Sequence, residues 1–276
     1  MSVSLKWTWV HRSLVCFIAS GWISLLLCSL TWADHRPKPG PAFTAPSKQL
    51  VARDTGVWFG LYNTYWLSEN WGYYGEYHLR RSQFFDQMSK LYLRFGVNYK
   101  IALRLRLTLG VVNRYTWSEH PGEPGEEDYV PEYRFWEQLL FSRRALRLKI
   151  YHQIRTEQRW RRSTSMEDPK YYYYNRFRYK FLVYGPLIGQ LFDKGSLFFC
   201  LYNEIFMQAG EKVEFNYFED NRAYVGIGYG LSNDLHLHLG YMKSFGQLDA
   251  FAFRNHDIFR VSLYHRLTLF DGTPEH

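Results

Sequence analysis

Strict alternation of apolar and polar residues over long segments constrains this chain more than any other feature. In Leu103–Val111, which reads LRLRLTLGV, leucine or valine fills every odd position and arginine, threonine or glycine fills every even one. Leu91–Lys100, Leu235–Tyr241 and Phe259–Leu269 follow the same period of two. Because successive side chains of a β-strand point to opposite faces, this period predicts strands with one apolar and one polar face.

Two kinds of β-protein show such alternation, a soluble antiparallel sandwich and a transmembrane barrel. Strands of soluble sheets average about 5–6 residues, whereas a strand that crosses a bilayer needs about 9–11. The alternating segments here are of the longer kind, and their apolar faces are rich in leucine. Aromatic residues make up 20% of the chain, and several tryptophans stand near segment ends, where a barrel has its aromatic girdles. The sequence therefore predicts an all-β fold, a single antiparallel transmembrane β-barrel with leucines toward lipid and arginines toward a wet lumen.

The strand count follows from the alternating segments and the turn signals between them. The segments lie near residues 55–67, 70–81, 88–100, 102–117, 131–142, 145–160, 171–184, 195–208, 218–230, 235–245 and 257–270. Single-chain bacterial barrels normally have an even number of strands. We therefore expect twelve strands, with a further one around Gln49–Arg53, and keep ten as the alternative. Short turns are expected at 99–101, 142–145 and 231–234, in alternation with long polar loops.

The first 33 residues have the composition of a secretory signal peptide. Lys6 and Arg12 precede an apolar run that ends at Leu30, and small residues flank a cleavage position after Ala33. No stop-transfer charge cluster follows, which favours a cleaved signal over a membrane anchor.

The remainder of the chain divides into three parts. They are a proline-rich linker at 34–54, the barrel at 55–270 and a C-terminal tail at 271–276. Signal and barrel together predict the outer membrane of a Gram-negative bacterium, with outer-membrane lipid and the barrel-assembly machinery as partners.

Several short motifs recur in a fixed order along the predicted barrel. They are W-x4-E-x3-R at Trp71, Glu76 and Arg80, LYLRFGVNYKIALRLRLTLG at 91–110, EYRFWEQL at 132–139, RTEQRW at 155–160, RFRY at 176–179, YNEIF at 202–206 and EDNRAYVGIGYGLSNDLHLHLGY at 219–241. In this order and spacing the chain resembles the uncharacterised outer-membrane barrels grouped as domain of unknown function 2490. The resemblance covers most of Thr55–Leu269 and implies a barrel in the bacterial outer membrane. It implies no known reaction.

Charged residues on the polar phase of the strands form the candidate functional site. The site consists of Glu76, Arg80, Arg94, Arg104, Arg106, Glu132, Arg134, Arg155, Glu157, Arg159, Arg176, Arg178, Glu204 and Arg222. In one interpretation the glutamates pair with arginines of other strands and fill a narrow barrel. In the other, arginines in excess of the carboxylates favour anions, as rings of arginine or lysine do in pores. The net charge of +8 agrees with an anionic ligand.

The function expected from these features is a narrow, porin-like pore or an anion- or solute-binding channel with an arginine-rich lumen. The alternative is a structural or surface-interaction barrel whose lumen is closed by ion pairs. A barrel lipid hydrolase is a weaker third hypothesis, because no serine–histidine spacing stands out.

The sequence predicts no catalytic residue, no cofactor and no metal site. His236 and His238 share one strand face, but no third ligand is identifiable beside them. An anionic small solute is the expected ligand. Nucleic acid is not expected, because the basic residues alternate inward instead of forming an outer stripe.

Overall fold

The computed structural model describes residues 50–118, 128–163, 168–210, 213, 216–248 and 252–271. These residues form eleven β-strands and no helix. The strands are β1 (Leu50–Trp66), β2 (Trp71–Ser82), β3 (Gln87–Ala102), β4 (Leu105–Trp117), β5 (Tyr129–Ala145), β6 (Leu148–Arg162), β7 (Tyr171–Ile188), β8 (Leu197–Gly210), β9 (Phe218–Gly230), β10 (Leu235–Gln247) and β11 (Ala252–Thr268). Within the described part of the chain, no helix is long and apolar enough to cross a membrane.

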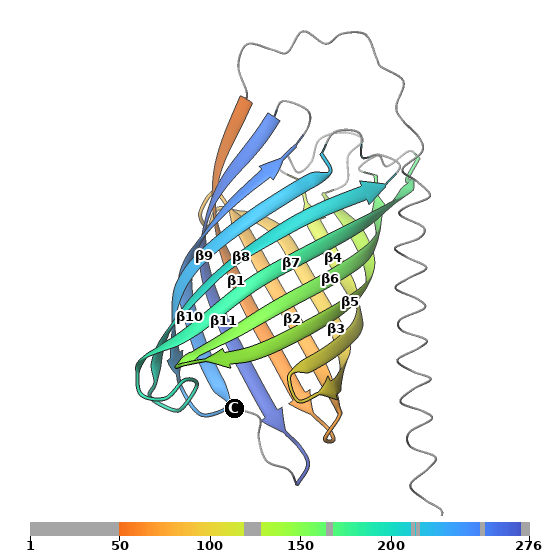
Figure 1. The fold of residues 1–276 in the computed structure, drawn as a ribbon. Helices are drawn as coiled ribbons and strands as arrows, with labels where there is room; N and C mark the ends of the chain where they lie inside the picture. Colours follow the sequence, from red (N-terminus) through yellow and green to blue (C-terminus); the bar gives the residue numbers. More distant parts are fainter. Residues whose placement is uncertain are drawn as a thin grey trace, which may run out of the picture. The chain divides into compact units, whose positions relative to one another are not determined.

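The eleven strands close into one barrel, with each strand antiparallel to the next (Figure 1). The seam is different, because β1 pairs with β11 in parallel, from Leu50 opposite Ala252 to Trp66 opposite Thr268. An up-and-down order with an odd number of strands makes the first and last run in the same direction, so their pairing has to be parallel.

The structure corrects two expectations about the strands. The described residues form neither twelve strands nor ten, because Leu50 to Arg53 begin β1 and do not form a strand of their own. The barrel is also not antiparallel throughout, since its seam is parallel.

The predicted boundaries agree with the structure better than the predicted turns do. Turns were expected at 99–101 and 142–145, but β3 continues to Ala102 and β5 to Ala145. The turn residues Leu103 and Arg104 continue the alternation, so the pattern alone cannot separate them from the strands. The first part of the predicted linker, the signal peptide at 1–33 and residues 272–276 of the predicted tail lie outside the described residues.

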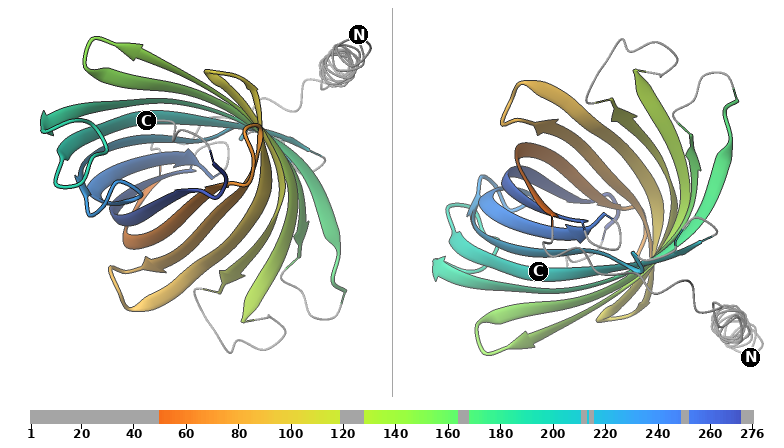
Figure 2. Two further views of the ribbon diagram at one scale, coloured as in Figure 1. Left: turned by 90° about the horizontal axis from the view of Figure 1, so that it is seen from below. Right: turned by 90° about the horizontal axis from the view of Figure 1, so that it is seen from above.

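The two faces of the wall differ as the alternation predicts. On β9, the side chains of Val225, Ile227 and Tyr229 are 52%, 50% and 46% exposed on the outer face. Tyr224, which directly precedes Val225, is on the opposite phase, points inward and is buried. Seen from either end, the strands form a continuous wall around the interior (Figure 2).

The two ends of the barrel have different connections. At one end, here called the turn end and lower in Figure 1, β1–β2, β3–β4, β5–β6 and β9–β10 are joined by short turns. At the other, the loop end, longer connections join β4–β5, β6–β7 and β8–β9. The β7–β8 connection at the turn end folds inward, so that the Phe192 side chain is buried and its carbonyl oxygen is 2.8 Å from Nε2 of His236. Phe192 packs there with Tyr184 and Phe198 in an aromatic cluster.

Candidate functional site

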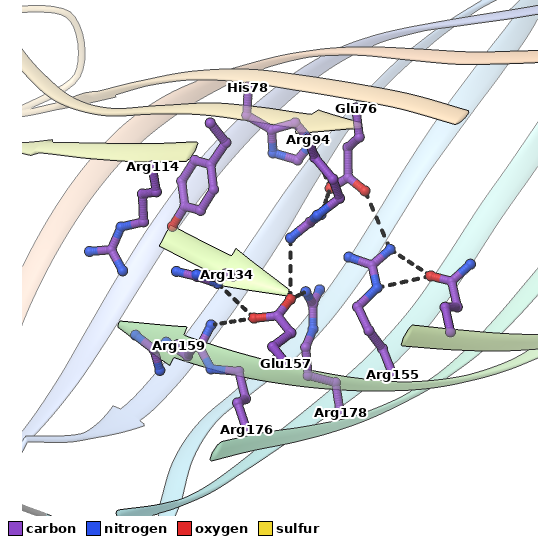
Figure 3. A network of polar contacts seen from close by, with 12 residues as sticks. Glu76, His78, Arg94, Arg114, Arg134, Arg155, Glu157, Arg159, Arg176 and Arg178 are labelled. Carbon is purple, nitrogen blue, oxygen red and sulfur yellow. Dashed lines mark hydrogen bonds and ion pairs between the residues drawn. The ribbon is translucent and has the colours of Figure 1, made fainter. Parts of the chain in front are cut away.

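Glu157 on β6 is the centre of the charged interior. Its side chain has no exposed surface, because the carboxylate lies among four guanidinium groups (Figure 3). Oε1 lies 2.7 Å from Nη1 of Arg178 and 3.2 Å from Nη2 of Arg94. Oε2 lies 2.6 Å from Nη1 of Arg134 and 3.4 Å from Nη1 of Arg176. One buried carboxylate therefore joins arginines from β3, β5 and β7.

Glu132 on β5 collects a second group of arginines. Its oxygens lie 2.6 Å from Nη1 of Arg114, 2.7 Å from Nε of Arg134 and 2.7 Å from Nε of Arg159. Arg134 thus bridges Glu132 and Glu157, so the two groups are continuous.

Glu76 on β2 contacts two arginines, one of which also contacts Glu157. Arg94 donates to its Oε1, and Nη2 of Arg155 lies 3.3 Å from its Oε2. Tyr74 donates a hydrogen bond of 2.8 Å to the same oxygen, Oε2. Because Arg94 contacts both Glu76 and Glu157, the three carboxylates belong to one connected network.

Glu204 and Glu219 extend the network along β8 and β9. Arg178 and Lys180 approach Glu204, with N–O distances of 2.6 and 3.2 Å. Glu219 accepts from Arg176 and lies 3.2 Å from Nη1 of Arg159. We call the whole set the ion-pair lattice. It consists of Glu76, Arg94, Arg114, Glu132, Arg134, Arg155, Glu157, Arg159, Arg176, Arg178, Lys180, Glu204 and Glu219.

Three of these lattice residues were not in the site predicted from sequence. Arg114 and Lys180 lie on the inward phase of their strands, so the alternation could have included them. Glu219 could not be found that way. The pairing of β8 with β9 shifts register between Phe206 and Met207, and Met207 faces Phe218 while Phe206 faces Asp220. This irregularity lets Glu219 and its neighbour Asp220 both contact arginines of the interior.

Several lattice contacts join strands that are not neighbours in the wall. Arg155 to Glu76 connects β6 with β2, and Arg94 to Glu157 connects β3 with β6. Contacts of this kind cross the interior, so side chains occupy it. Trp136 is also completely buried, with the guanidinium carbons of Arg155 and Arg94 at 4.7 and 5.4 Å from its ring centroid. Gly96 and Gly110 make room for that ring, since a Cβ on Gly110 would lie 2.9 Å from Trp136 Cε2.

The remaining predicted site residues lie elsewhere. Arg104 is exposed in the β3–β4 turn and does not reach the lattice, which corrects its predicted place in the lumen. Arg106 is near the turn end, with its guanidinium 5.9 Å from the ring centroid of Trp66. Arg80 and Arg222 lie on the loop-end side of the lattice and line a cavity there.

This cavity, the vestibule, has a volume of about 470 Å³ and is bounded by the loop-end parts of all the described strands except β5. Eight basic side chains line it: Arg80, Lys90, Arg114, Arg159, Arg161, Arg176, Arg222 and Arg254. Three acidic side chains line it: Asp54, Glu219 and Asp220. Basic side chains therefore outnumber acidic ones in the lining of the vestibule, although Arg114, Arg159, Arg176 and Glu219 also belong to the ion-pair lattice.

The two histidines considered as metal ligands lie at the turn end. His236 and His238 are both buried, and the rings of Phe192 and Phe198 pack against them. Among the described residues, no three histidine, cysteine or acidic side chains are grouped so that they could hold a metal ion.

Fold and interior together define a class, a closed all-β barrel with a charged, side-chain-filled interior. The model of the family described as "Protein of unknown function (DUF2490)" matches residues 55–255. The chain belongs to this family, as its motifs indicated.

Two further comparisons concern curated proteins and solved structures. Among curated proteins, none matches this sequence. A solved structure similar to the chain is LpxR from Salmonella typhimurium, with 11% sequence identity and a TM-score of 0.42 over 70% of this chain and 83% of that one.

Proposed function

We propose that this chain is a bacterial outer-membrane barrel that does not conduct and that captures an anionic solute in its vestibule. The outer face carries apolar side chains such as Val225 and Ile227 at about half exposure, as a lipid-facing wall requires. Closure pairs the backbone of every strand on both sides, which the absence of water in the bilayer core demands. The longer loops would face outward from the cell, since that is their usual side.

A blocked lumen accounts for the interior better than the narrow pore expected from its arginines. The observation that carries this choice is the pair of contacts from β6 to β2 and β3, Arg155–Glu76 and Arg94–Glu157. Both contacts lie across the interior, and breaking a buried ion pair costs about 3–5 kcal/mol, so each of them opposes the opening of a path for an ion. The aromatic cluster around Phe192 adds a second barrier at the turn end.

The vestibule, with a volume of about 470 Å³, has room for a ligand. Its eight basic and three acidic side chains give it an excess of positive charge. A concave site with one sign of charge and low-dielectric walls concentrates counter-ions. The ligand in this proposal is an anionic small solute, and the other partners are outer-membrane lipid and the barrel-assembly machinery.

Planar-bilayer recording combined with an anion-binding assay tests the proposal. The purified protein, shown to be folded by heat-modifiable gel migration, should give no steady current at any voltage. Calorimetric titration with pyrophosphate should show binding that weakens as salt is raised, because screening reduces the attraction. Steady conductance would restore the pore hypothesis, and absence of any anion binding would leave a purely structural barrel.

A further inference from the structure

Arg80 differs from the arginines of the lattice because it has no carboxylate partner among the described residues. Its side chain is on β2, is only 7% exposed and lines the vestibule. Its Nη1 donates a hydrogen bond of 3.2 Å to the hydroxyl oxygen of Tyr92. Its Nε is buried and has no hydrogen-bond partner in the described part of the chain. A buried guanidinium is costly unless a counter-charge or acceptors satisfy it.

The guanidinium group of Arg80 packs against two aromatic rings, and each ring also contacts another arginine. The guanidinium carbon of Arg80 lies 3.5 Å from the ring centroid of Trp58 and 4.3 Å from that of Tyr92. Arg222 approaches the same Trp58 ring at 5.3 Å, and Arg114 approaches the same Tyr92 ring at 5.7 Å. Three strands, β2, β4 and β9, therefore direct guanidinium groups toward the base of the vestibule.

The nearby carboxylates do not balance these charges. Arg114 shares Glu132 with Arg134 and Arg159. The partner of Arg222 is Asp220, at 2.7 Å, and the other oxygen of Asp220 accepts a hydrogen bond of 2.7 Å from Ser244. Glu132 and Asp220 thus already have basic partners, and Arg80 adds a positive charge that no carboxylate of the described residues pairs with.

We propose that the base of the vestibule, between Arg80, Arg114 and Arg222, binds the phosphate group of a phosphate monoester or of inorganic phosphate. This inference rests on the proposed capture of an anion and names its chemical class. A single guanidinium fork matches a carboxylate and a phosphate alike. Guanidinium groups from three strands favour the tetrahedral anion, because its oxygens point in several directions. A divalent anion also offsets the local excess of positive charge better than a monovalent one.

The phosphate could come from a soluble compound or from a lipid headgroup, and binding measurements on the purified full-length protein separate the two. The probes are inorganic phosphate, glycerol 3-phosphate, vesicles that contain phosphatidic acid, and acetate as the carboxylate comparison. Wild-type protein should bind phosphate at least tenfold more tightly than acetate. Preference for glycerol 3-phosphate would identify a soluble ligand and preference for phosphatidic acid a lipid, and either supports the site. Equal affinity for acetate and phosphate would overturn it.

Substitutions locate the binding. Arg80→Gln should weaken phosphate binding at least tenfold, and Arg80→Lys should weaken it less, because the charge remains while the fork is lost. Arg147→Gln removes the same charge from an exposed position in the β5–β6 turn, so it should leave binding unchanged. If Arg80→Gln does not fold, Arg222→Gln takes its place in the comparison. Anion binding that is unaffected by these inner substitutions would refute the phosphate site alone, whereas no anion binding to wild type would refute the proposed function as well.

Discussion

Arg94 on β3 and Glu157 on β6 form an ion pair inside the barrel, with 3.2 Å between Nη2 and Oε1, although β4 and β5 lie between their strands in the wall. The ion pair therefore connects two strands that form no backbone hydrogen bonds with each other. Because Glu157 also contacts three further arginines, its carboxylate keeps several like charges together in a buried space.

Replacing that carboxylate should destabilise the barrel. Glu157→Gln keeps the shape but leaves four guanidinium groups without their shared counter-charge, and breaking a buried pair costs about 3–5 kcal/mol. Urea unfolding followed by heat-modifiable gel migration measures the loss. Glu69→Gln, in the exposed β1–β2 turn, makes the same chemical change and should have no measurable effect. Equal stability of both variants would show that the lattice contributes nothing to the fold.

Glu137 should respond in the opposite way, because it lies on the outer face. It is near the middle of β5, next to the inward Trp136, and its bonds go to Thr156 and to Nε2 of Gln158, 3.4 Å from Oε2. In a bilayer a lipid-facing charge is unfavourable, and for Glu the cost is below about 2–4 kcal/mol. Glu137→Leu should therefore raise the urea midpoint in lipid vesicles. A lower midpoint would mean that this carboxylate is needed on the outer surface.

Arginine on the outer wall should hinder insertion. Val225→Arg places a charge in the middle of β9, where a lipid-facing arginine costs about 2–4 kcal/mol. Leu231→Arg makes a similar change in the β9–β10 turn, outside the strands, and should be tolerated. The fraction of each variant that folds into vesicles is the measurement. Similar yields for the two variants would argue against a lipid-facing wall at Val225.

Phe192 should contribute stability in spite of its backbone. Its φ of 73° lies in the left-handed region, which glycine adopts more easily, so replacement by glycine relieves backbone strain of about 1–2 kcal/mol. Removing a buried phenylalanine side chain, however, costs about 3–5 kcal/mol. Phe192→Gly should thus lower the melting temperature. Leu146→Gly is the matched control, because Leu146 has a φ of 55° and a fully exposed side chain, and this variant should be more stable than wild type. A gain in both variants would mean that the aromatic cluster does not hold the turn end.

The sequence predicts the strands well because one period governs the whole wall. Residues such as Val225 and Tyr224 reveal their faces by position alone. The parallel seam is not predictable in this way, since alternation says nothing about which strand pairs with which. The same limit applies to the turn at Leu103 and Arg104, which continues the alternation.

The site was predictable in composition but not in arrangement. Alternation places Arg94 and Glu157 on inward phases, yet only the curvature of the barrel brings β3 and β6 together. Glu219 depends on a local shift of register, and the inward fold of the loop at Phe192 depends on tertiary packing. For these reasons the pattern of charges indicated an arginine-rich lumen and left open whether its own carboxylates would fill it.

The parallel seam has a consequence for how the barrel is completed. Its two strands come from opposite ends of the described chain, so their pairing requires the largest loop closure in the fold, and contacts of this kind form slowly. Until β11 docks on β1, both β1 and β10 present free edges, to which another extended segment could pair. Of the described strands, the last in chain order is thus the one that covers the free edge of the first, and without β11 these strands would remain an open sheet.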